Sequence, residues 1–342
     1  MQSQTPSQPV CGPVALGWSS PSLFGENNLA RVTSLVSAQA KQRATALHLE
    51  GVPNPTFLGA LLPLCSGKEP PISVVALDAA VGAVQTPRAA NAKLCALDKE
   101  EALAATEVAL RALQWSETVE ARFVRLHLGD VAGLSTLWRK ARGHFLRGAA
   151  PEDSTPGDEL LSARSALLPP HWTAVCRSLE RLCNRALAMG KTLLIAYPRR
   201  PTDLPLPLEL WLLLQDFAGA PLAPSLDLPA AHLASTMRLT PLSLSVRAFS
   251  PGPFHLIGDA CGQVGALPPG WGEVDVPAVC GALPPDATLS FLPWSGLSFA
   301  EVGAALESLR AVWLGQRPVT DAAEAAAQST STTTDKGVIL RW

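Results

Sequence analysis

The chain has 342 residues, of which 47% are hydrophobic and 16% are charged, so it has enough apolar material to bury a large core. Its formal net charge of −2 provides no positive field, which disfavours nucleic acid or an anionic membrane surface as a partner. The seven cysteines are odd in number, scattered and never spaced CxxC, which argues against a disulfide framework and a zinc knuckle.

The N-terminal stretch MQSQTPSQPVCGPVALGW has no basic segment followed by an uninterrupted apolar run, so it is not a recognisable signal peptide. We therefore expect a cytoplasmic location. The most apolar windows, such as residues 206–218, contain prolines or an acid within fewer than the roughly 20 residues that a membrane span needs. No membrane span is predicted.

Short apolar runs alternate with helix-like stretches along the chain, which is typical of a parallel sheet whose strands are connected by helices. The predicted strands are residues 14–18, 46–50, 73–78, 123–128, 192–197, 222–227, 254–259 and 288–293. The clearest predicted helices are residues 98–115, 170–189, 207–217 and 298–313. Residues 143–169 are polar and contain Gly and Pro, which predicts an exposed loop. Eight strands of this kind predict a (β/α)8 barrel, an α/β fold, spanning residues 1–316.

Residues 317–336 are small, polar and low in complexity, which predicts a flexible tail from residue 317 to residue 342. The tail ends in the apolar peptide GVILRW. Two interpretations of this peptide are open. It packs on its own barrel, or it binds another protein by strand addition or through a Trp anchor. In the second interpretation the partner-binding residues are Val338, Ile339, Leu340 and Trp342.

The motif Gly258-Asp259-Ala260-Cys261-Gly262 is followed by the loop LPPGWGEVD at residues 267–275. This stretch resembles the region after the seventh strand of the sugar phosphate isomerase/epimerase family, the xylose-isomerase-like TIM barrels. Together with the strand alternation, the resemblance covers about residues 10–315. It implies a TIM barrel whose active site lies at the C-terminal ends of the strands.

The resemblance also implies a divalent metal held by Glu, Asp, His and Glu from different strands, and most of these positions differ here. Ala196 stands in place of the fifth-strand glutamate. In the sixth strand Asp227 is kept, but Ala230 replaces the histidine. Leu256 takes the position of the seventh-strand histidine, although a one-residue bulge could turn His255 inward. Leu292 replaces the final glutamate.

Asp227 and Asp259 are the ligand positions that plainly survive, with His127 as a possible third and His255 as a weak candidate. One or two carboxylates hold a hard dication weakly. No cofactor is therefore expected, and Mn, Zn, Mg or Fe would be the ion if the site were functional. The alternative is that the strand register is misjudged at one or more strands. Further polar residues at predicted strand ends are Glu50, Asp78, Asp130 and His232, and Cys261 is the thiol nearest the predicted rim.

Two classes of function follow. The first is a catalytically degenerate barrel, a pseudoenzyme that binds a protein or small molecule through its mouth or its terminal peptide. The second is a divergent isomerase or epimerase of a small polyhydroxylated substrate, metal-dependent or metal-independent, with Asp227 or Asp259 as base and His127 or His255 as acid. The sequence leans toward the first. The DNA-repair activity of endonuclease-like relatives is disfavoured by the missing ligands and the acidic chain.

Overall fold

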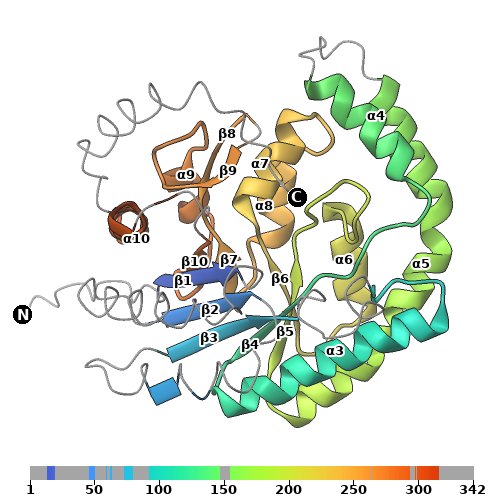
Figure 1. The fold of residues 1–342 in the computed structure, drawn as a ribbon, viewed down its shortest axis with the longest axis horizontal. Helices are drawn as coiled ribbons and strands as arrows, with labels where there is room; N and C mark the ends of the chain where they lie inside the picture. The colour runs from blue at the N-terminus through green and yellow to red at the C-terminus, as the bar shows by residue number, and fades with distance from the viewer. Residues whose placement is uncertain are drawn as a thin grey trace, which may run out of the picture.

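The computed structural model describes residues 14–19, 46–50, 59, 62–63, 73–79, 92–146, 155–262, 264–292, 297 and 299–315. Eight parallel strands form a nearly closed (β/α)8 TIM barrel, as the sequence predicts (Figure 1). The barrel strands are β1 (Val14–Ser19), β2 (Ala46–Glu50), β3 (Ser73–Asp78), β4 (Phe123–Leu126), β5 (Thr192–Ala196), β6 (Leu222–Ser225), β7 (Phe254–Leu256) and β10 (Thr288–Phe291).

The strands are hydrogen-bonded in the order β6-β5-β4-β3-β2-β1-β10-β7. The two ends of this sheet meet where Asp227 and Leu256 form a parallel bridge and the Leu256 amide donates to the Leu226 carbonyl at 2.8 Å. All eight predicted strands are therefore confirmed, with small differences at their ends except in the seventh, which is half the predicted length. Parallel order matters for function because it brings all C-terminal strand ends to one rim.

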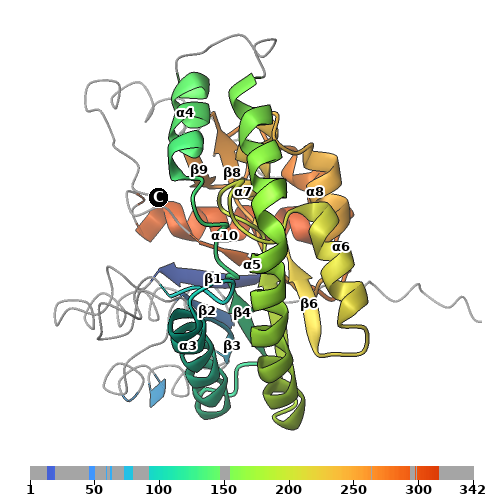
Figure 2. The ribbon, with the colours of Figure 1, turned by 90° about the vertical axis from the view of Figure 1, so that its right-hand side faces the viewer.

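Helices cover the outside of the barrel. They are α3 (Lys99–Thr118), α4 (Ser135–Leu146), α5 (Thr155–Ala188), α6 (Pro207–Asp216), α7 (Leu228–Thr236), α8 (Leu242–Phe249), α9 (Val276–Gly281) and α10 (Phe299–Trp313). Figure 2 shows α5 running along much of the molecule, with α4 beside its upper part. None of the described helices is both long and apolar enough to cross a membrane.

Side chains alternate between the two faces of each strand, so they form two apolar layers. The outward layer, which includes Leu193 and Ile195, packs against the helices in the main core. The inward layer, made of Ala76, Phe123, Leu194, Phe254 and Leu256, fills the barrel. Further along the same strands, toward the C-terminal rim, the inward side chains become polar: Asp78 comes two residues after Ala76, and Arg125 two residues after Phe123. The apolar layer therefore lies directly beneath the candidate site.

The predicted loop at residues 143–169 is wrong at both ends, because α4 continues to Leu146 and α5 begins at Thr155 and contains Pro169 and Pro170. Residues 147–154 lie outside the described residues. Proline removes a helical hydrogen bond and crowds the preceding turn, which is why the sequence favoured a helix start at residue 170. Tertiary contacts hold the extra turns: Leu160 is fully buried, and the buried Arg164 forms an ion pair with Glu209 of α6. Packing overrides local propensity here.

The predicted seventh strand, residues 254–259, is shorter than expected. β7 ends at Leu256, and Asp259 begins a separate antiparallel hairpin of β8 (Asp259–Cys261) and β9 (Val264–Leu267). The terminal peptide and its residues Val338 to Trp342 lie outside the described residues.

Candidate functional site

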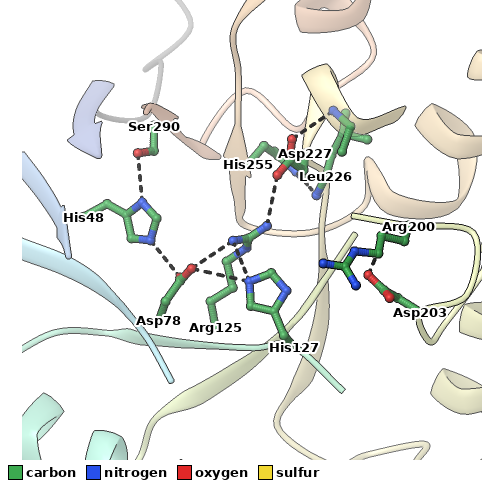
Figure 3. Close-up of polar contacts among 11 residues, drawn as sticks. His48, Asp78, Arg125, His127, Arg200, Asp203, Leu226, Asp227, His255 and Ser290 are labelled. Atoms are coloured by element: carbon green, nitrogen blue, oxygen red, sulfur yellow. Dashed lines mark hydrogen bonds and ion pairs between the residues drawn. The ribbon is translucent and has the colours of Figure 1, made fainter. Parts of the chain in front are cut away.

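A cluster of buried polar side chains lies inside the barrel, on the rim side of the apolar plug (Figure 3). His48 comes from β2, Asp78 from the end of β3, Arg125 from β4 and Ser290 from β10. All four are fully buried. Phe123 and Arg125 are two residues apart on one strand, so they share its inward face, as do Ala76 and Asp78 on β3. We call His48, Asp78, Arg125, His127 and Ser290 the rim cluster.

Asp78 is the centre of the rim cluster. One carboxylate oxygen accepts from His48 Nε2 at 2.8 Å, and the other accepts from Arg125 Nη1 at 3.0 Å. His48 Nδ1 lies 3.2 Å from the Ser290 hydroxyl. Burial alone would raise the pKa of Asp78, but Arg125 and the imidazoles of His48 and His127 outweigh it and hold the pKa well below its usual value. Asp78 is therefore a carboxylate at neutral pH.

Arg125 joins two carboxylates across the barrel interior. Besides its bond to Asp78, its Nη2 forms an ion pair with Asp227 at 3.6 Å, which is longer than a hydrogen bond. Among the described residues, neither Nη2 nor Nε has a hydrogen-bond partner. A buried guanidinium with unpaired N–H groups is costly, because it has lost its water and gained only part of the compensation. Arg125 thus holds unused hydrogen-bonding capacity inside the barrel.

His127 follows β4, and 25% of its side chain is exposed to solvent. The other four residues of the rim cluster are fully buried. The Nε2 atom of His127 lies 3.4 Å from Arg125 Nη1 and 3.6 Å from Asp78. Burial and the positive charges of Arg199 and Arg125 lower the pKa of His127, although Asp78 opposes them. The ring is therefore neutral at pH 7, and a neutral imidazole can accept a proton.

Asp227 has a structural task besides its contact with Arg125. It is the N-cap of α7, where its Oδ1 accepts from the Ala230 amide at 3.1 Å. Its other oxygen faces Arg125. The Ala230 position, where the family resemblance implies a histidine, is in the first turn of this helix and contributes a backbone amide to the cap.

His255 is turned away from the rim. The β7–β10 register is regular, with Leu289 opposite His255, so the bulge that would turn it inward is absent from this strand pair. His255 Nε2 donates to the Gly252 carbonyl at 2.8 Å, and Nδ1 accepts from the Leu226 amide at 3.2 Å. Burial lowers its pKa to about 4. Both ring nitrogens are engaged by backbone, so His255 is a neutral structural residue.

Asp259 organises the Pro-Pro-Gly loop. Its buried carboxylate accepts backbone N–H groups from Ala260, Gly270, Gly272 and Val274 at 2.7–3.0 Å. A Cβ atom on Gly272 would collide with the Ala260 carbonyl and with Asp259 itself, which explains the glycine. Asp259 therefore stabilises the loop whose sequence carries the family resemblance, and it makes no described contact with the rim cluster.

Three other predicted rim residues, Asp130, His232 and Cys261, make their described side-chain contacts outside the rim cluster. Asp130 forms an ion pair with Lys93 at 2.5 Å, and His232 lies 3.9 Å from Glu273. Cys261 is exposed and donates to Glu273 at 3.2 Å. The side chain of Glu50 lies outside the described atoms.

Apolar residues occupy the opposite part of the interior. Leu256 belongs to the inward plug, and Ala196 is buried two residues beyond the plug residue Leu194 on the same face of β5. The strand assignments that put Ala196 and Leu256 on the inward face are thus consistent with the structure. Leu292, which follows β10, is half-buried.

The described side chains do not fit a divalent metal. Asp78 is engaged by His48 and Arg125, and Asp227 by the α7 amide and Arg125. No group of three or more His, Cys, Asp or Glu side chains in the described part of the chain is arranged to hold an ion. A metal would also have to sit beside a guanidinium that is always protonated.

The sequence reading missed His48, Arg125 and Ser290 as site residues. A signal for Arg125 was present: Phe123, Arg125 and His127 alternate along one strand, so a charged residue precedes the candidate histidine on the same face. Similarly, His48 stands two residues before the predicted rim residue Glu50 in the sequence. The predicted site residues lie at strand ends, whereas His48 and Arg125 lie two residues earlier in the chain than Glu50 and His127.

Solved structures of sugar-isomerase and epimerase barrels resemble this fold. A xylose isomerase domain protein from Planctomyces limnophilus has a TM-score of 0.56 at 15% identity, covering 88% of this chain and 96% of its own. An L-ribulose 3-epimerase has a TM-score of 0.57 at 14% identity, covering 96% and 100%. The 3-keto-D-glucoside 4-epimerase of E. coli has a TM-score of 0.58 at 12% identity, covering 87% and 99%. The sequence matches no family model and has no significant match among curated proteins. At these identities the likeness establishes the fold.

Proposed function

We propose that this chain, which has the fold of the xylose-isomerase-like TIM barrels, acts on a small polyhydroxylated carbonyl compound by proton transfer without a metal ion. The observation that carries the proposal is the pairing of a neutral, partly exposed His127 with the buried cation Arg125 at the barrel rim. Epimerases of L-ribulose and of 3-keto-D-glucoside share the fold, which supports this substrate class.

The roles follow from the charges. Removing a proton beside a carbonyl places negative charge on the carbonyl oxygen, and a fixed cation stabilises that charge. Arg125 has N–H groups at Nη2 and Nε without a hydrogen-bond partner among the described residues, and Nη2 contacts Asp227 only at 3.6 Å. His127 is the base: in the tautomer whose Nε2–H points toward Asp78, Nε2 no longer accepts from Arg125 Nη1, and Nδ1 carries the free lone pair. Asp78 then orients the ring and stabilises the imidazolium, while His48 and Ser290 position Asp78.

The test is exchange of the substrate's α-proton in D2O, followed by NMR over a panel of ketoses, aldoses and their phosphates. The protein is dialysed against EDTA first. We expect exchange with at least one sugar that EDTA does not abolish, and its loss by about a hundredfold or more in His127→Asn. His144→Asn, the same change on α4, serves as the control and should retain the activity.

A second candidate is a barrel that binds a ligand or protein without turnover. It is favoured by Ala196 and Leu256, which place apolar groups in one part of the interior, and by the partners that Asp78 and Asp227 already have. In this case one compound would raise the melting temperature, and no proton exchange would accompany binding. Wild-type rates in the His127→Asn variant would also count against the proton-transfer proposal.

A further inference from the structure

We propose that Arg199 and Arg200, on the loop between β5 and α6, bind a phosphate group at the mouth of the barrel. The proposal deepens the proposed function and rests on it for the substrate, because the phosphate belongs to the sugar whose carbonyl end reaches His127. Three features of the loop carry the proposal: its position at the rim, its fixed backbone and its charge.

The two arginines lie at the rim, just after the end of β5. β5 ends at Ala196, and Arg199 and Arg200 follow as exposed residues. The positive charge of Arg199 helps to lower the pKa of His127, so the two side chains lie within electrostatic range of each other. Figure 3 shows the Arg200 side chain extending from its loop toward the rim cluster. Both cations therefore stand at the mouth on the same side as His127.

The backbone of this loop is fixed by contacts with its neighbours. The Asp203 carboxylate accepts from the Arg200 amide at 2.9 Å, and Arg164 Nη2 donates to the Asp203 carbonyl at 2.8 Å. The Val131 amide, after β4, donates to the Thr202 carbonyl at 2.9 Å. Cations on a backbone that is already ordered lose less conformational entropy when a ligand binds, which favours affinity.

The charges divide the rim into an interior that suits an uncharged group and an entrance that suits an anion. In the interior, Asp78 and Asp227 already face Arg125, so little net charge is left to attract an anion. At the entrance, Arg199 and Arg200 add two guanidinium groups. A phosphate monoester carries about −1.5 to −2 charges at pH 7 and offers three acceptor oxygens, which guanidinium groups bind through paired hydrogen bonds. A sugar with a carbonyl at one end and a phosphate at the other matches both parts.

The experiment starts with inorganic phosphate, because this probe requires no knowledge of the sugar. We expect the full chain to bind one equivalent at low ionic strength, measured by calorimetry. Bound phosphate should raise the pKa of His127, followed by NMR, because it offsets the charge of Arg199. In R199Q and in R200Q the affinity should fall about tenfold or more. R185Q is the matched control and should bind as the wild type does, because Arg185 is exposed near the end of α5 that leads into β5, at the opposite end of the barrel.

Sugar phosphates then distinguish a substrate from a free phosphate ion. Each phosphate of the turnover panel is compared with its unphosphorylated parent sugar. We expect at least one ester to bind about tenfold more tightly than both its parent and inorganic phosphate, and to lose that advantage in R199Q and R200Q. Esters that bind no more tightly than inorganic phosphate would overturn the assignment of the phosphate to the substrate.

Two further results would overturn the proposal. One is an unchanged phosphate affinity in both R199Q and R200Q. The other is phosphate binding that leaves the pKa of His127 unchanged, which would mean an adventitious ion elsewhere on the surface. Tight binding of a sugar phosphate without proton exchange would defeat the proposed function and leave the phosphate site standing, whereas exchange confined to unphosphorylated sugars would do the reverse.

Discussion

The two sides of the barrel rim use their polar residues in opposite ways. On the side formed by β2, β3 and β4, the inward residues His48, Asp78 and Arg125 form a buried charged cluster. On the side formed by β5 and β7, the inward residues are apolar, whereas His255 and Asp259 bind backbone groups elsewhere. The chemical type of a rim residue therefore does not predict its role. The role depends on whether the side chain points into the barrel or away from it.

The energetic basis of the two sides also differs. The charges of the rim cluster compensate one another through side chains, so removing one leaves another buried and unpaired. His255 and Asp259 are satisfied by main-chain groups, so their loss disturbs a local segment. The following changes test this difference, from the largest expected effect to the smallest.

Asp78→Ala should have the largest effect on stability. It removes the carboxylate that forms the close ion pair with Arg125 and accepts from His48, which leaves a buried guanidinium with Asp227 as its remaining described counter-charge. We expect the free energy of unfolding to fall by about 3–5 kcal/mol, measured by urea denaturation. Asp130→Ala, which removes a partly exposed partner of Lys93, should cost about 1 kcal/mol or less. Equal losses in the two variants would contradict the charge-compensation account.

The pH dependence of Asp78 has a defined sign. Because its folded-state pKa lies below its usual value, the unfolded chain binds more protons as the pH falls below about 4. The stabilisation is present above that pH and is lost as the pH falls through the folded-state pKa. Asp78→Asn should therefore show a shallower loss of stability in acid than the wild type.

Asp259→Ala should destabilise the protein by about 3 kcal/mol, because four backbone amides lose their charged acceptor. The expected damage is local: amide hydrogen exchange should accelerate at Gly270, Gly272 and Val274, while the amides of β4 keep their protection. Faster exchange throughout β4 would mean that the loop and the rim cluster depend on each other, and the separation of the two sides would fail.

His255 makes stability depend on pH in a different window. Its folded-state pKa of about 4 lies below the ordinary value of 6.5, so between these pH values the unfolded state binds the extra proton. Stability should decrease as the pH falls from about 6.5 to 4, by at most about 3 kcal/mol from this residue. His255→Gln should be less stable at pH 7 and should lose less stability over that interval. An unchanged slope would place the titration elsewhere.

The sequence was sufficient to predict the barrel because eight apolar runs and the helices between them carry strong periodic signals, and β2 and β3 match their predicted bounds. The site was harder to predict, because it depends on which residues of different strands meet. In the sequence, Arg125 is a single charge in an apolar strand, and its role depends on the strand register, which places it opposite Asp78. The structural role of Asp259 arises from backbone amides that follow it by up to 15 residues, and no side-chain pattern indicates them.

The smallest predicted effect concerns Cys261 on the β8–β9 hairpin. Its hydrogen bond to Glu273, with some burial, raises the pKa of the thiol, so little thiolate is present at pH 8. In Glu273→Gln, alkylation of Cys261 by iodoacetamide should be several-fold faster, as measured by mass spectrometry of the Cys261 peptide. Glu307→Gln, a substitution of an exposed glutamate on α10, should leave the rate unchanged. Cys280 is buried with its pKa raised to about 12, so it should remain unmodified in all three proteins. If Glu273→Gln alkylated no faster, the hydrogen bond would not control this thiol, and its reactivity would reflect access alone.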